Sequence, residues 1–464
     1  MKAFTLTQAA EGCGGILKHP VEGIITQVTI DSRQVEPGSL YIAIVGERFD
    51  GHDFIEDCYQ KGAVCVVSHK ELDTQKPYIL VKDTRLALGN LGSWYRQWLN
   101  PFVVGVTGSV GKTSTKEMVW TVLSAGETTG KTQGNLNNDI GLPRTLLSLE
   151  EEQTAAVVEM GMNHKGEISY LTNLAKPNAA IITNIGTSHI ENLGSRENIL
   201  AAKLEILEGL AKDGPVILNA DNDLLATLKQ IDLHHPKLYY GIQDTTGALY
   251  AKQVQVTQEQ TRFVLVYQGK EYPAMVPAVG KHHVYNAMAA FLAGRLRGLE
   301  PDAMVEAMSH YENTGMRQKM IRHPDGYTII ADCYNASPDS MESSIAALSA
   351  MECSGKRIAA LGDMLELGEQ SYQLHCKVGA MVADSLIDIL LCFGPESKYI
   401  CEGAYRAGFD NIIWCKSKEK MAATIAKNCK PGDVVLFKAS RGMHFEEVID
   451  AICTPVTPQE KGEL

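Results

Sequence analysis

A short stretch of this 464-residue chain has the residue types and spacing to hold phosphate groups. It reads T-G-S-V-G-K-T over Thr107–Thr113 and follows an apolar, β-branched run at 102–106, which predicts a buried strand. Glycines let the backbone curl so that successive N–H groups face an anion, and a helix beginning near Lys112 adds its positive end. Lys112 can reach the β- and γ-phosphates, and the Thr113 hydroxyl suits Mg²⁺. We therefore predict that ATP or GTP binds with magnesium to Thr107, Gly108, Ser109, Val110, Gly111, Lys112 and Thr113.

The loop departs from the strict phosphate-loop pattern at one position. That pattern places glycine at position 106, where this chain has Val106, and the nearest glycine is Gly105. The plain alternative is a glycine-rich turn between a strand and a helix that carries Gly-Lys-Thr by chance. The ordered series of strand, glycines, lysine and threonine favours nucleotide binding. The absence of an N-K-x-D base-reading motif argues against a GTPase switch.

Two further chemical groups follow apolar runs of the kind that build a parallel sheet. Glu159 ends the run 155–158, and His189 lies beyond the run 179–182. The carboxyl ends of such strands face the ligand crevice, so Glu159 is placed to bind magnesium or an ordered water rather than to stand at a solvated edge. For His189, a surface position and a ligand position stay equally open. Lys203, on an amphipathic helical pattern, indicates by itself a solvated side chain.

Amide-rich and charged turns supply less specific signals. The segment 132–141 is dense in amides, which suit either a cluster of turns or polar recognition of a ligand. Its candidate binding residues are Asn135, Asn137 and Asn138. Asn286 opens a helix over 287–296, where its amide can contact a base or cap the helix. The charged turn at 31–33 indicates, from its chemistry alone, a solvated surface.

The composition is that of a globular protein, with 45% hydrophobic and 21% charged residues. Lys plus Arg number 43 and Asp plus Glu 55, so the net charge of −12 argues against nucleic acid or an anionic membrane as the main partner. The 11 cysteines are scattered without a C-x-x-C pair, which indicates reduced thiols. Neither a signal peptide nor an apolar run of membrane-spanning length is found. We expect a cytoplasmic protein without membrane insertion.

The length predicts about two to four domains, and the order of strand-like and helix-like segments divides the chain into three α/β units. Residues 1–98 are predicted to form a small N-terminal domain, and 99–313 a central phosphate-loop domain with a mostly parallel sheet. Residues 314–464 carry strand-like runs separated by helices, the pattern of a Rossmann-like, doubly wound domain. We expect hinge-like junctions near residues 100 and 314, and a frayed tail over 454–464.

Taken together, these chemical residues resemble the Mur ligases, the ATP-dependent amide-forming enzymes of peptidoglycan precursor synthesis. The resemblance extends, in order and with family spacing, over nearly the whole chain. It implies an N-terminal domain for a UDP-linked substrate, a central ATP-binding domain and a C-terminal ligase domain. It rests on Thr107–Thr113, Glu159-Met-Gly, the segment 184–189, Lys203, His283-x-x-Asn286, Arg317 and Asp332.

The resemblance also implies a role for each residue at a matching position. Lys112, His189 and Lys203 are implied to be catalytic, with Lys203 converted to a carbamate that binds metal instead of repelling it. Two Mg²⁺ ions are implied, held by Thr113, Glu159, His189 and Lys203. Beyond the phosphate loop, the implied ATP contacts are Asn286, Arg317 and Asp332. The implied contacts to the other substrates are Asp31, Ser32, Arg33, Asn135, Asn137, Asn138, Ser188, Asn335, Glu366 and Arg441.

Three stretches, 134–143, 332–341 and 361–368, resemble the family members that join D-alanyl-D-alanine to UDP-N-acetylmuramoyl-tripeptide. The Asp-Asn-Pro-Arg motif of the members that add the diamino acid is absent. Two departures lie near the C-terminus: Ala439 stands where glycine is usual, and Met443-His-Phe-Glu stands where a Met-Glu run is usual.

The resemblance therefore implies a monomeric, ATP-dependent ligase that acts on these two small molecules through an acyl phosphate. It also replaces the solvated interpretation of the turn at 31–33 with a grip on the UDP end of the substrate. Two alternatives stay open. One is another ligase of the superfamily, including a folylpolyglutamate synthase-like enzyme, and the other is a phosphate-loop ATPase without ligase activity.

Overall fold

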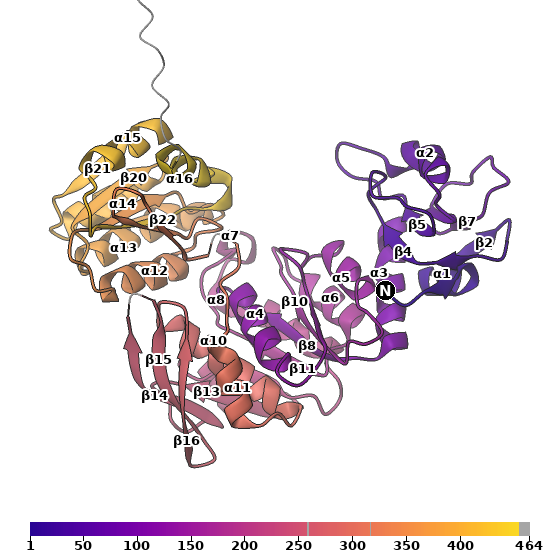
Figure 1. The fold of residues 1–464 in the computed structure, drawn as a ribbon, viewed down its shortest axis with the longest axis horizontal. Coiled ribbons are helices and arrows are strands. Elements are labelled where there is room, and N and C mark those ends of the chain that lie inside the picture. The colour runs from indigo at the N-terminus through magenta and orange to yellow at the C-terminus, as the bar shows by residue number, and fades with distance from the viewer. Residues whose placement is uncertain (258, 316, 454–464) are drawn as a thin grey trace, which may run out of the picture.

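The computed structural model describes residues 1–257, 259–315 and 317–453, and these form three α/β units. Figure 1 shows them as three lobes, with the central unit between the N-terminal and the C-terminal one. Each unit is built around its own large sheet, of five, nine and six strands in chain order. The predicted three-domain α/β architecture is thus confirmed, whereas the predicted domain limits stay predictions. The predicted tail over 454–464 lies outside the described residues.

The N-terminal unit has a five-stranded sheet in the order β2-β7-β6-β5-β4, in which β2 runs antiparallel to β7 and the other pairs are parallel. Strands β5 and β6 are buried at every position, which fits their continuous apolar sequence. A separate antiparallel pair joins β1 and β3. The elements are β1 (Phe4–Thr5), α1 (Leu6–Cys13), β2 (Ile16–Lys18), β3 (Ile24–Ile25), β4 (Gln27–Thr29), β5 (Ser39–Ile42), η1 (Gly51–Phe54), α2 (Ile55–Gln60), β6 (Cys65–Ser68), β7 (Tyr78–Leu80) and α3 (Thr84–Leu99).

The central unit has a nine-stranded sheet in the order β16-β15-β14-β13-β12-β11-β8-β10-β9. Neighbours from β9 to β14 run parallel, and β14, β15 and β16 form an antiparallel end, so the predicted mostly parallel sheet is confirmed. The strands are β8 (Phe102–Thr107), β9 (Thr129–Lys131), β10 (Ala155–Glu159), β11 (Ala179–Ile182), β12 (Val216–Asn219), β13 (Lys237–Gly241), β14 (Leu249–Val256), β15 (Thr261–Tyr267) and β16 (Lys270–Val276). The helices are α4 (Lys112–Leu123), α5 (Gly141–Leu147), α6 (Glu167–Ala175), α7 (Ile190–Leu193), α8 (Arg196–Leu204), η2 (Glu205–Gly209), α9 (Asp223–Thr227), η3 (Leu228–Gln230), α10 (His282–Leu296) and α11 (Pro301–Met308).

Successive residues of the central strands bury opposite faces, and a different set of helices covers each face. Val104 and Val106 of β8 belong to a core with helices α4, α10 and α11. Val103, between them in the pleat, belongs to a second core with α5, α6 and α8. Both faces of the sheet around β8 are thus buried, whereas the antiparallel end exposes polar side chains such as Gln253 and Glu271.

The N-terminal and central units share that second core. One cluster of buried apolar side chains extends from Phe4 to Tyr239 and includes α3, α5 and α6. The close packing depends on Gly92 of α3, because a Cβ there would lie 2.9 Å from the Pro143 Cα of α5. The two units are therefore packed together next to residue 100, whose own side chain is exposed. The described residues between α11 and β17, by contrast, contain neither helix nor strand.

The C-terminal unit is a six-stranded sheet in the order β17-β18-β22-β19-β20-β21, parallel except for the edge strand β17. Helices α12, α13 and α14 share a core with one face, and α15 and α16 with the other, which confirms the predicted doubly wound fold. The strands are β17 (Lys319–Arg322), β18 (Thr328–Ala331), β19 (Arg357–Gly362), β20 (Ile389–Phe393), β21 (Ile412–Cys415) and β22 (Val434–Lys438). The helices are α12 (Pro338–Ala350), η4 (Gly368–Gln370), α13 (Ser371–Ala383), α14 (Ser397–Arg406), α15 (Lys418–Asn428), η5 (Arg441–Met443) and α16 (Glu446–Cys453).

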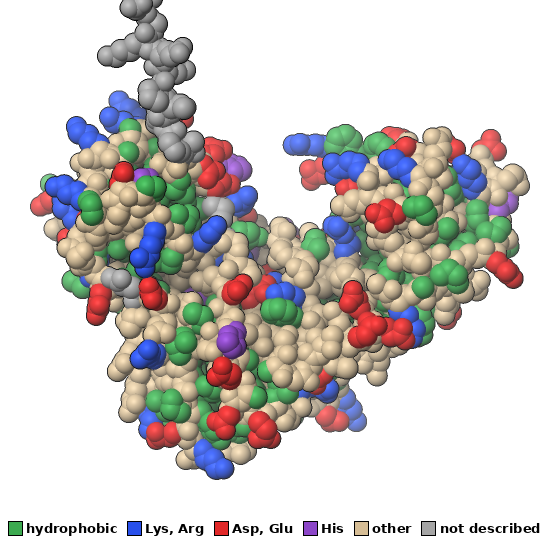
Figure 2. Space-filling view, in the orientation of Figure 1, with side chains coloured by type: hydrophobic (Ala, Val, Ile, Leu, Met, Phe, Trp, Pro, Cys, Tyr) green, Lys and Arg blue, Asp and Glu red, His purple; other side chains and the backbone are tan. Residues whose placement is uncertain are grey.

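Figure 2 shows an open hollow between the N-terminal and C-terminal lobes, with the central unit as its floor. All 11 cysteines are free thiols, and six of them are buried. Over the described ranges, none of the helices combines the length and the apolar character that crossing a bilayer requires.

Candidate active site

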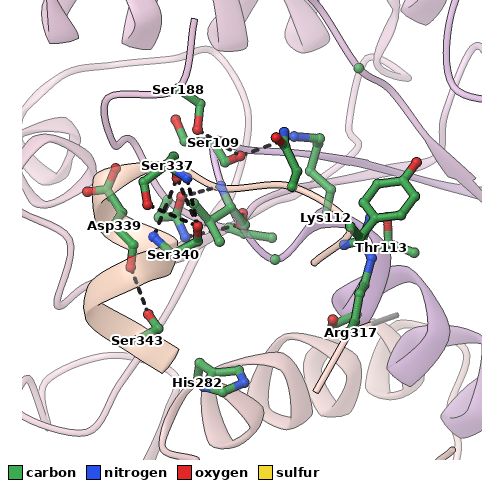
Figure 3. A pocket seen from close by; sticks show the side chains of 18 of the residues that line it. Ser109, Lys112, Thr113, Ser188, His282, Arg317, Ser337, Asp339, Ser340 and Ser343 are labelled. Atoms are coloured by element: carbon green, nitrogen blue, oxygen red, sulfur yellow. Dashed lines mark hydrogen bonds between the residues drawn. The ribbon is translucent and has the colours of Figure 1, made fainter. Parts of the chain in front are cut away.

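A cavity of about 520 Å³ lies where the central and C-terminal units meet, and it is lined almost entirely by polar side chains. Figure 3 shows Ser337, Asp339 and Ser340 of the C-terminal unit on one side of it, and Lys112 and Thr113 of the central unit on the other. Among the predicted site residues, those that line the cavity are Ser109, Val110, Gly111, Lys112, Thr113, Asn135, Asn137, Asn138, Glu159, Ser188, His189, Asn286, Arg317, Asp332 and Asn335.

The phosphate-loop candidate has the geometry that its sequence predicts. Strand β8 ends at Thr107, helix α4 begins at Lys112, and the loop between them turns through Gly108 at φ +150° and Gly111 at φ +82°. A Cβ at Gly108 would lie 1.9 Å from the Thr183 Oγ1, so no larger residue fits. The Lys112 amine reaches back over the loop, 2.9 Å from the Gly108 carbonyl and 3.2 Å from that of Ser109.

The end of the neighbouring strand β11 holds this loop in place. The Ser109 N–H donates to the Asn184 carbonyl (3.0 Å), and the Val110 N–H donates to the Asn184 Oδ1 (2.9 Å). The Val110 carbonyl accepts from the Thr183 hydroxyl (2.6 Å) and from the Asn184 Nδ2 (3.1 Å). On the other side, the Thr107 hydroxyl donates to the Met160 carbonyl beyond β10 (2.9 Å). The loop is therefore a rigid cradle before any anion binds.

Glu159 stands at the end of β10, next to this loop. The parallel register pairs it with Val106, and the Thr113 hydroxyl donates to its Oε2 over 2.6 Å. The Asn137 Nδ2 donates to the other carboxylate oxygen over 2.8 Å, so the amide-rich segment packs against the same group. Only 2% of Glu159 is exposed. A buried carboxylate beside a hydroxyl is an all-oxygen donor set of the kind that Mg²⁺ takes together with nucleotide phosphates. The residues present therefore fit a magnesium ion.

Two lysines lie close to one another here, Lys112 half-buried in the loop and Lys203 buried. Burial lowers the pKa of Lys112, the charge of Arg317 lowers it further, and Glu159 partly opposes the shift. Burial, and then the charge of Lys112, lower the pKa of Lys203 well below its usual value. No carboxylate among the described residues lies within ion-pairing distance of Lys203, which is 1% exposed at the end of α8. Its surroundings therefore favour the neutral amine over the charged ammonium.

His189 follows β11 and faces the C-terminal unit. Its Nδ1 lies 2.8 Å from the Glu366 Oε2, and burial followed by the charge of Lys112 lowers its pKa. Both residues have left-handed backbone, at φ +63°. Glu366 does not line the cavity itself; it reaches the site through His189.

The start of α10 and the segment before β17 form another wall of the cavity. The Asn286 Oδ1 accepts from the Thr115 hydroxyl (2.9 Å), while its buried Nδ2 has no hydrogen-bond partner among the described residues. That orphaned donor fits an acceptor of a bound base. The Arg317 guanidinium lies 4.4 Å from the Tyr334 ring centre.

Two contacts of the C-terminal unit were not predicted from the sequence. The Lys438 amine, at the end of β22, donates to the Asp332 Oδ2 over 2.8 Å. Asp339, in the first turn of α12, accepts from both the backbone N–H (2.8 Å) and the hydroxyl (3.0 Å) of Thr187 in the central unit. Gly186 leaves room for this carboxylate, since a Cβ there would lie 2.3 Å from it.

Other cavity-lining residues also escaped the sequence-based selection, among them Ser337, Ser340, His282 and Gln318. Two signals could have found most of the missed groups. Ser337, Asp339 and Ser340 belong to the stretch 332–341, and Lys438 ends an apolar strand as Glu159 does. Gln318 carried no signal of this kind.

The predicted UDP contacts lie apart from the cavity. Asp31 and Arg33 form a two-pronged ion pair, with nitrogen–oxygen distances of 2.9 and 2.7 Å, that holds the pKa of Asp31 at about 2. The Ser32 carbonyl accepts from the Lys61 amine over 3.0 Å. Arg441, in η5, lies 3.1 Å from the Glu446 carboxylate and does not line the cavity. The structure thus brings together the predicted nucleotide and metal residues, and leaves the predicted UDP residues on the N-terminal lobe.

Three family models match this chain. The Mur ligase middle domain matches residues 106–294, the Mur ligase glutamate ligase domain matches 316–441, and the model described as Mur ligase family, catalytic domain, matches 24–96. Together they cover more than half of the chain, and the first contains the loop, Glu159, His189 and Lys203.

Curated relatives and solved structures agree with these matches. The chain is 40% identical, over 98% of its length and 99% of the relative's, to the UDP-N-acetylmuramoyl-tripeptide--D-alanyl-D-alanine ligase of Bacillus subtilis. It is 34% identical to that of Escherichia coli, over 97% and 99% of the two chains. A crystal structure of MurF from Acinetobacter baumannii matches with TM-score 0.90 and 30% identity, over 98% and 99% of the chains. MurF ligase from Thermotoga maritima in complex with ADP matches with TM-score 0.83 and 29% identity, over 92% and 96%. This chain belongs to the Mur ligase family.

Proposed function

We propose that this chain is the ligase that joins D-alanyl-D-alanine to UDP-N-acetylmuramoyl-tripeptide at the expense of ATP. The observation that carries the proposal is the polar cavity. The phosphate loop and Glu159 of the central domain line it, together with Arg317, Asp332 and Lys438 from later in the chain. Such a cavity suits a reaction that needs ATP and a second substrate enclosed together. Relatives with this named activity match the chain over nearly its full length.

The reaction has two steps, and both place developing negative charge on oxygen. A carboxylate oxygen of the tripeptide attacks the γ-phosphorus of ATP, the bond to the bridging oxygen breaks, and ADP leaves. The amine of D-alanyl-D-alanine then attacks the acyl carbon, loses a proton, and expels phosphate as the amide forms. Lys112, fixed above the loop, stabilises charge on the transferring phosphoryl group, as do the loop N–H groups.

The metal-binding residues in this proposal are Thr113 and Glu159 for one Mg²⁺ ion, and His189 and carbamylated Lys203 for a second. Bound magnesium would neutralise charge on the phosphate oxygens. The chain's own contribution is to hold the ligands: Asn137 orients Glu159, and burial favours the neutral form of the Lys203 amine by lowering its pKa. A neutral amine is the form that adds carbon dioxide, so the environment of Lys203 supports the carbamate.

The remaining roles follow from position. Asn286, with its unpaired amide, is assigned to the adenine base, and Arg317 and Asp332 to the nucleotide from the C-terminal side. Asn335 and Ser188 line the same cavity and are assigned to the peptide substrates, together with Asn135 and Asn138. The turn Asp31-Ser32-Arg33 is assigned to the UDP end and Arg441 to the dipeptide. We further propose a cytoplasmic monomer that acts on small molecules, in keeping with its free thiols.

The test is phosphate release from ATP in the presence of UDP-N-acetylmuramoyl-tripeptide, with and without D-alanyl-D-alanine. We expect release to require both substrates and the product to be heavier by one dipeptide unit. A Lys112→Met variant, which keeps the length of the side chain without its charge, should bind the UDP substrate and release no phosphate. Release with another amine but not with this dipeptide would point to a sister ligase, and release without any amine to a plain ATPase.

The carbamate has a separate test in the protein without nucleotide. On addition of ¹³C-bicarbonate we expect a ¹³C carbamate signal from the wild type and none from Lys203→Met. A wild type that gives no such signal, under conditions where it ligates, would contradict the carbamate while leaving the activity untouched.

A further inference from the structure

We propose that Thr132 is a positioning residue, which fixes the strand end that carries Glu159, and that Lys116 acts behind it by holding Thr132. The inference rests on the proposed function and deepens it, because Glu159 is the carboxylate proposed to bind magnesium. Both Thr132 and Lys116 are 0% exposed, and neither lines the cavity. The proposed ligation mechanism gives a role to neither of them.

Thr132 stands where the pairing between β9 and β10 stops. The last paired residues are Lys131 and Val157, and the Thr132 N–H still donates to the Val157 carbonyl over 3.0 Å. In a regular parallel ladder the next bond would join the Glu159 N–H to the Thr132 carbonyl. Instead, the Glu159 N–H donates to the Thr132 hydroxyl over 3.0 Å. A side chain thus replaces a backbone acceptor at the residue whose carboxylate the site uses.

The Thr132 carbonyl, which the ladder does not use, has a partner of its own. The Lys116 amine donates to it over 2.7 Å from the second turn of α4. Glu117, itself only 5% exposed, forms ion pairs with Lys116 (2.9 Å) and with Lys131. An ammonium without such a partner would be costly to bury, so Glu117 allows a charged donor to stand beneath the strand end.

These contacts close a ring between one helix and one strand end. Thr113 and Lys116 are three residues apart on α4, and residues with this spacing face the same side of a helix. The Thr113 hydroxyl donates to the Glu159 carboxylate over 2.6 Å. Lys116 holds Thr132, which holds the Glu159 backbone. Glu159 is therefore fixed at both its backbone and its carboxylate, relative to the helix that begins at the phosphate loop.

The consequence concerns affinity for the metal rather than for the nucleotide alone. A ligand that is already held in place loses little freedom on binding, whereas a loose carboxylate has to be ordered by the metal. The Thr113 hydroxyl is itself a proposed metal ligand, so Thr132 provides an anchor for Glu159 that is independent of the metal. Without the Thr132 hydroxyl, the buried Glu159 N–H loses its acceptor, and the strand end has to shift to find another.

The test is Mn²⁺ binding in the presence of ADP, measured by electron paramagnetic resonance, which needs neither the tripeptide nor turnover. We expect Thr132→Val, which keeps the shape of the side chain but removes the acceptor, to weaken Mn²⁺ binding about 10- to 100-fold. Thr132→Ser, which keeps the hydroxyl, should bind Mn²⁺ nearly as the wild type does. The affinity for ADP in the presence of EDTA should be the same in all three proteins.

The matched control is Thr261→Val on β15. Thr261 is also 0% exposed, and its hydroxyl likewise accepts from a backbone N–H, that of Gly280, over 3.1 Å. Strands β14, β13, β12, β11 and β8 separate β15 from β10, so this variant should lose stability without losing Mn²⁺ affinity. Lys116→Met should weaken Mn²⁺ binding in the wild type and add little in the Thr132→Val background, because the two residues act through one contact.

Amide hydrogen exchange, followed by NMR in the protein without metal or nucleotide, gives a second readout. We expect the Glu159 N–H to be protected in the wild type and in Thr132→Ser, and to exchange faster in Thr132→Val. The Val157 amide of the same strand is the reference and should stay protected in all three. If Thr132→Val does not fold, the wild type still decides, since a Glu159 N–H that exchanges as fast as exposed amides would overturn the inference.

Other outcomes contradict the inference as plainly. Equal Mn²⁺ affinity in Thr132→Val and the wild type would overturn it, as would an equal loss in Thr132→Ser and Thr132→Val. A matching loss of metal-free ADP binding in Thr132→Val would show a general structural role instead. A wild type that binds no Mn²⁺ would overturn the metal site and this inference with it. A wild type that binds Mn²⁺ with ADP but does not ligate would overturn the proposed function alone.

Discussion

At the scale of single residues, the site depends on positions where only one side chain fits. The loop glycines illustrate this, because their backbone angles and their neighbours restrict them independently. Gly108 lies at φ +150° with the Thr183 hydroxyl against it, whereas Gly111 lies at φ +82° and a Cβ there would meet nothing nearer than 3.6 Å. Steric exclusion therefore matters most at Gly108.

We expect Gly108→Ala to lose ATP binding at least tenfold, because the added methyl must displace Thr183, which holds the loop through Val110. The control is Gly269→Ala, in the turn between β15 and β16, which has φ +78° and open space around it. That variant should cost about 1–2 kcal/mol of stability for left-handed backbone and leave binding intact. Calorimetric titration with ADP measures the affinities, and circular dichroism checks the folds. Equal binding by Gly108→Ala and wild type would contradict the cradle.

A second prediction at this scale concerns pH. Burial lowers the pKa of His375, against the opposing charges of Asp363 and Glu396, so the folded state resists a proton that the unfolded chain accepts near pH 6.5. Stability from this group is complete above pH 6.5 and is lost as the pH falls through and below that value. Its share of the slope is at most one proton, about 1.4 kcal/mol per pH unit.

His375→Gln should therefore show a shallower loss of unfolding free energy between pH 6.5 and pH 5 than the wild type. Urea unfolding at several pH values measures the difference. Parallel curves for the two proteins would show that folded His375 takes up a proton as readily as in the unfolded chain, which would contradict its Nε2 as the acceptor of the Met364 N–H (3.0 Å).

At the scale of elements, both departures from the family pattern lie against the same end of the C-terminal sheet. Ala439 follows β22, is fully buried, and packs beside Gly362 at the end of β19. A Cβ added at Gly362 would lie 2.8 Å from the Ala439 Cβ. The ring of Phe445, also fully buried, would lie 2.7 Å from that added Gly362 Cβ. The alanine and the phenylalanine thus fill space that Gly362 leaves free.

We expect Gly362→Ala to destabilise the fold by about 1–3 kcal/mol through overpacking. Adding Ala439→Gly should recover only part of that loss, because the Phe445 contact persists. A double-mutant cycle by denaturant unfolding measures the coupling. Strict additivity of the two changes would contradict the contact between these positions.

Local sequence patterns were enough to predict the strands and the loop that form the phosphate-binding part of the site. Strand β8, the phosphate loop and Glu159 were predictable because a buried parallel strand, a glycine turn and a carboxylate at a strand end are short-range signals. Strand β17 has no such local signal, because its residues are mostly exposed and it is a strand only through pairing with β18. The contacts of Asp339 with Thr187 and of Glu366 with His189 depend on how two domains dock, which no local pattern encodes.

At the scale of the whole molecule, the three units are not equally independent. The N-terminal and central units share a continuous core through α3, whereas the two cores of the C-terminal unit take, among the described residues, only Val256 and Val279 from the central unit. Its docking on the central unit includes polar contacts such as Asp339 with Thr187 and His189 with Glu366. Movement is therefore expected near residue 314 and not near residue 100.

Small-angle scattering can test this difference. With an ATP analogue and the UDP substrate, we expect the wild type to become more compact as the C-terminal lobe moves over the hollow seen in Figure 2. Thr187→Val, which keeps the backbone N–H but loses the hydroxyl to Asp339, should shift the unliganded profile toward an open form. Identical profiles in all states would contradict a hinge near 314.

The most direct test of an acyl phosphate formed in the cavity is the transfer of an oxygen atom. The tripeptide substrate is labelled with ¹⁸O in the carboxylate that reacts, and the released phosphate is analysed by mass spectrometry after a single turnover with ATP and D-alanyl-D-alanine. We expect one ¹⁸O atom in each phosphate, because the carboxylate oxygen that attacks the γ-phosphorus leaves with it. Unlabelled phosphate, with one ¹⁸O atom in the new amide carbonyl and the other lost to water, would contradict the proposed chemistry.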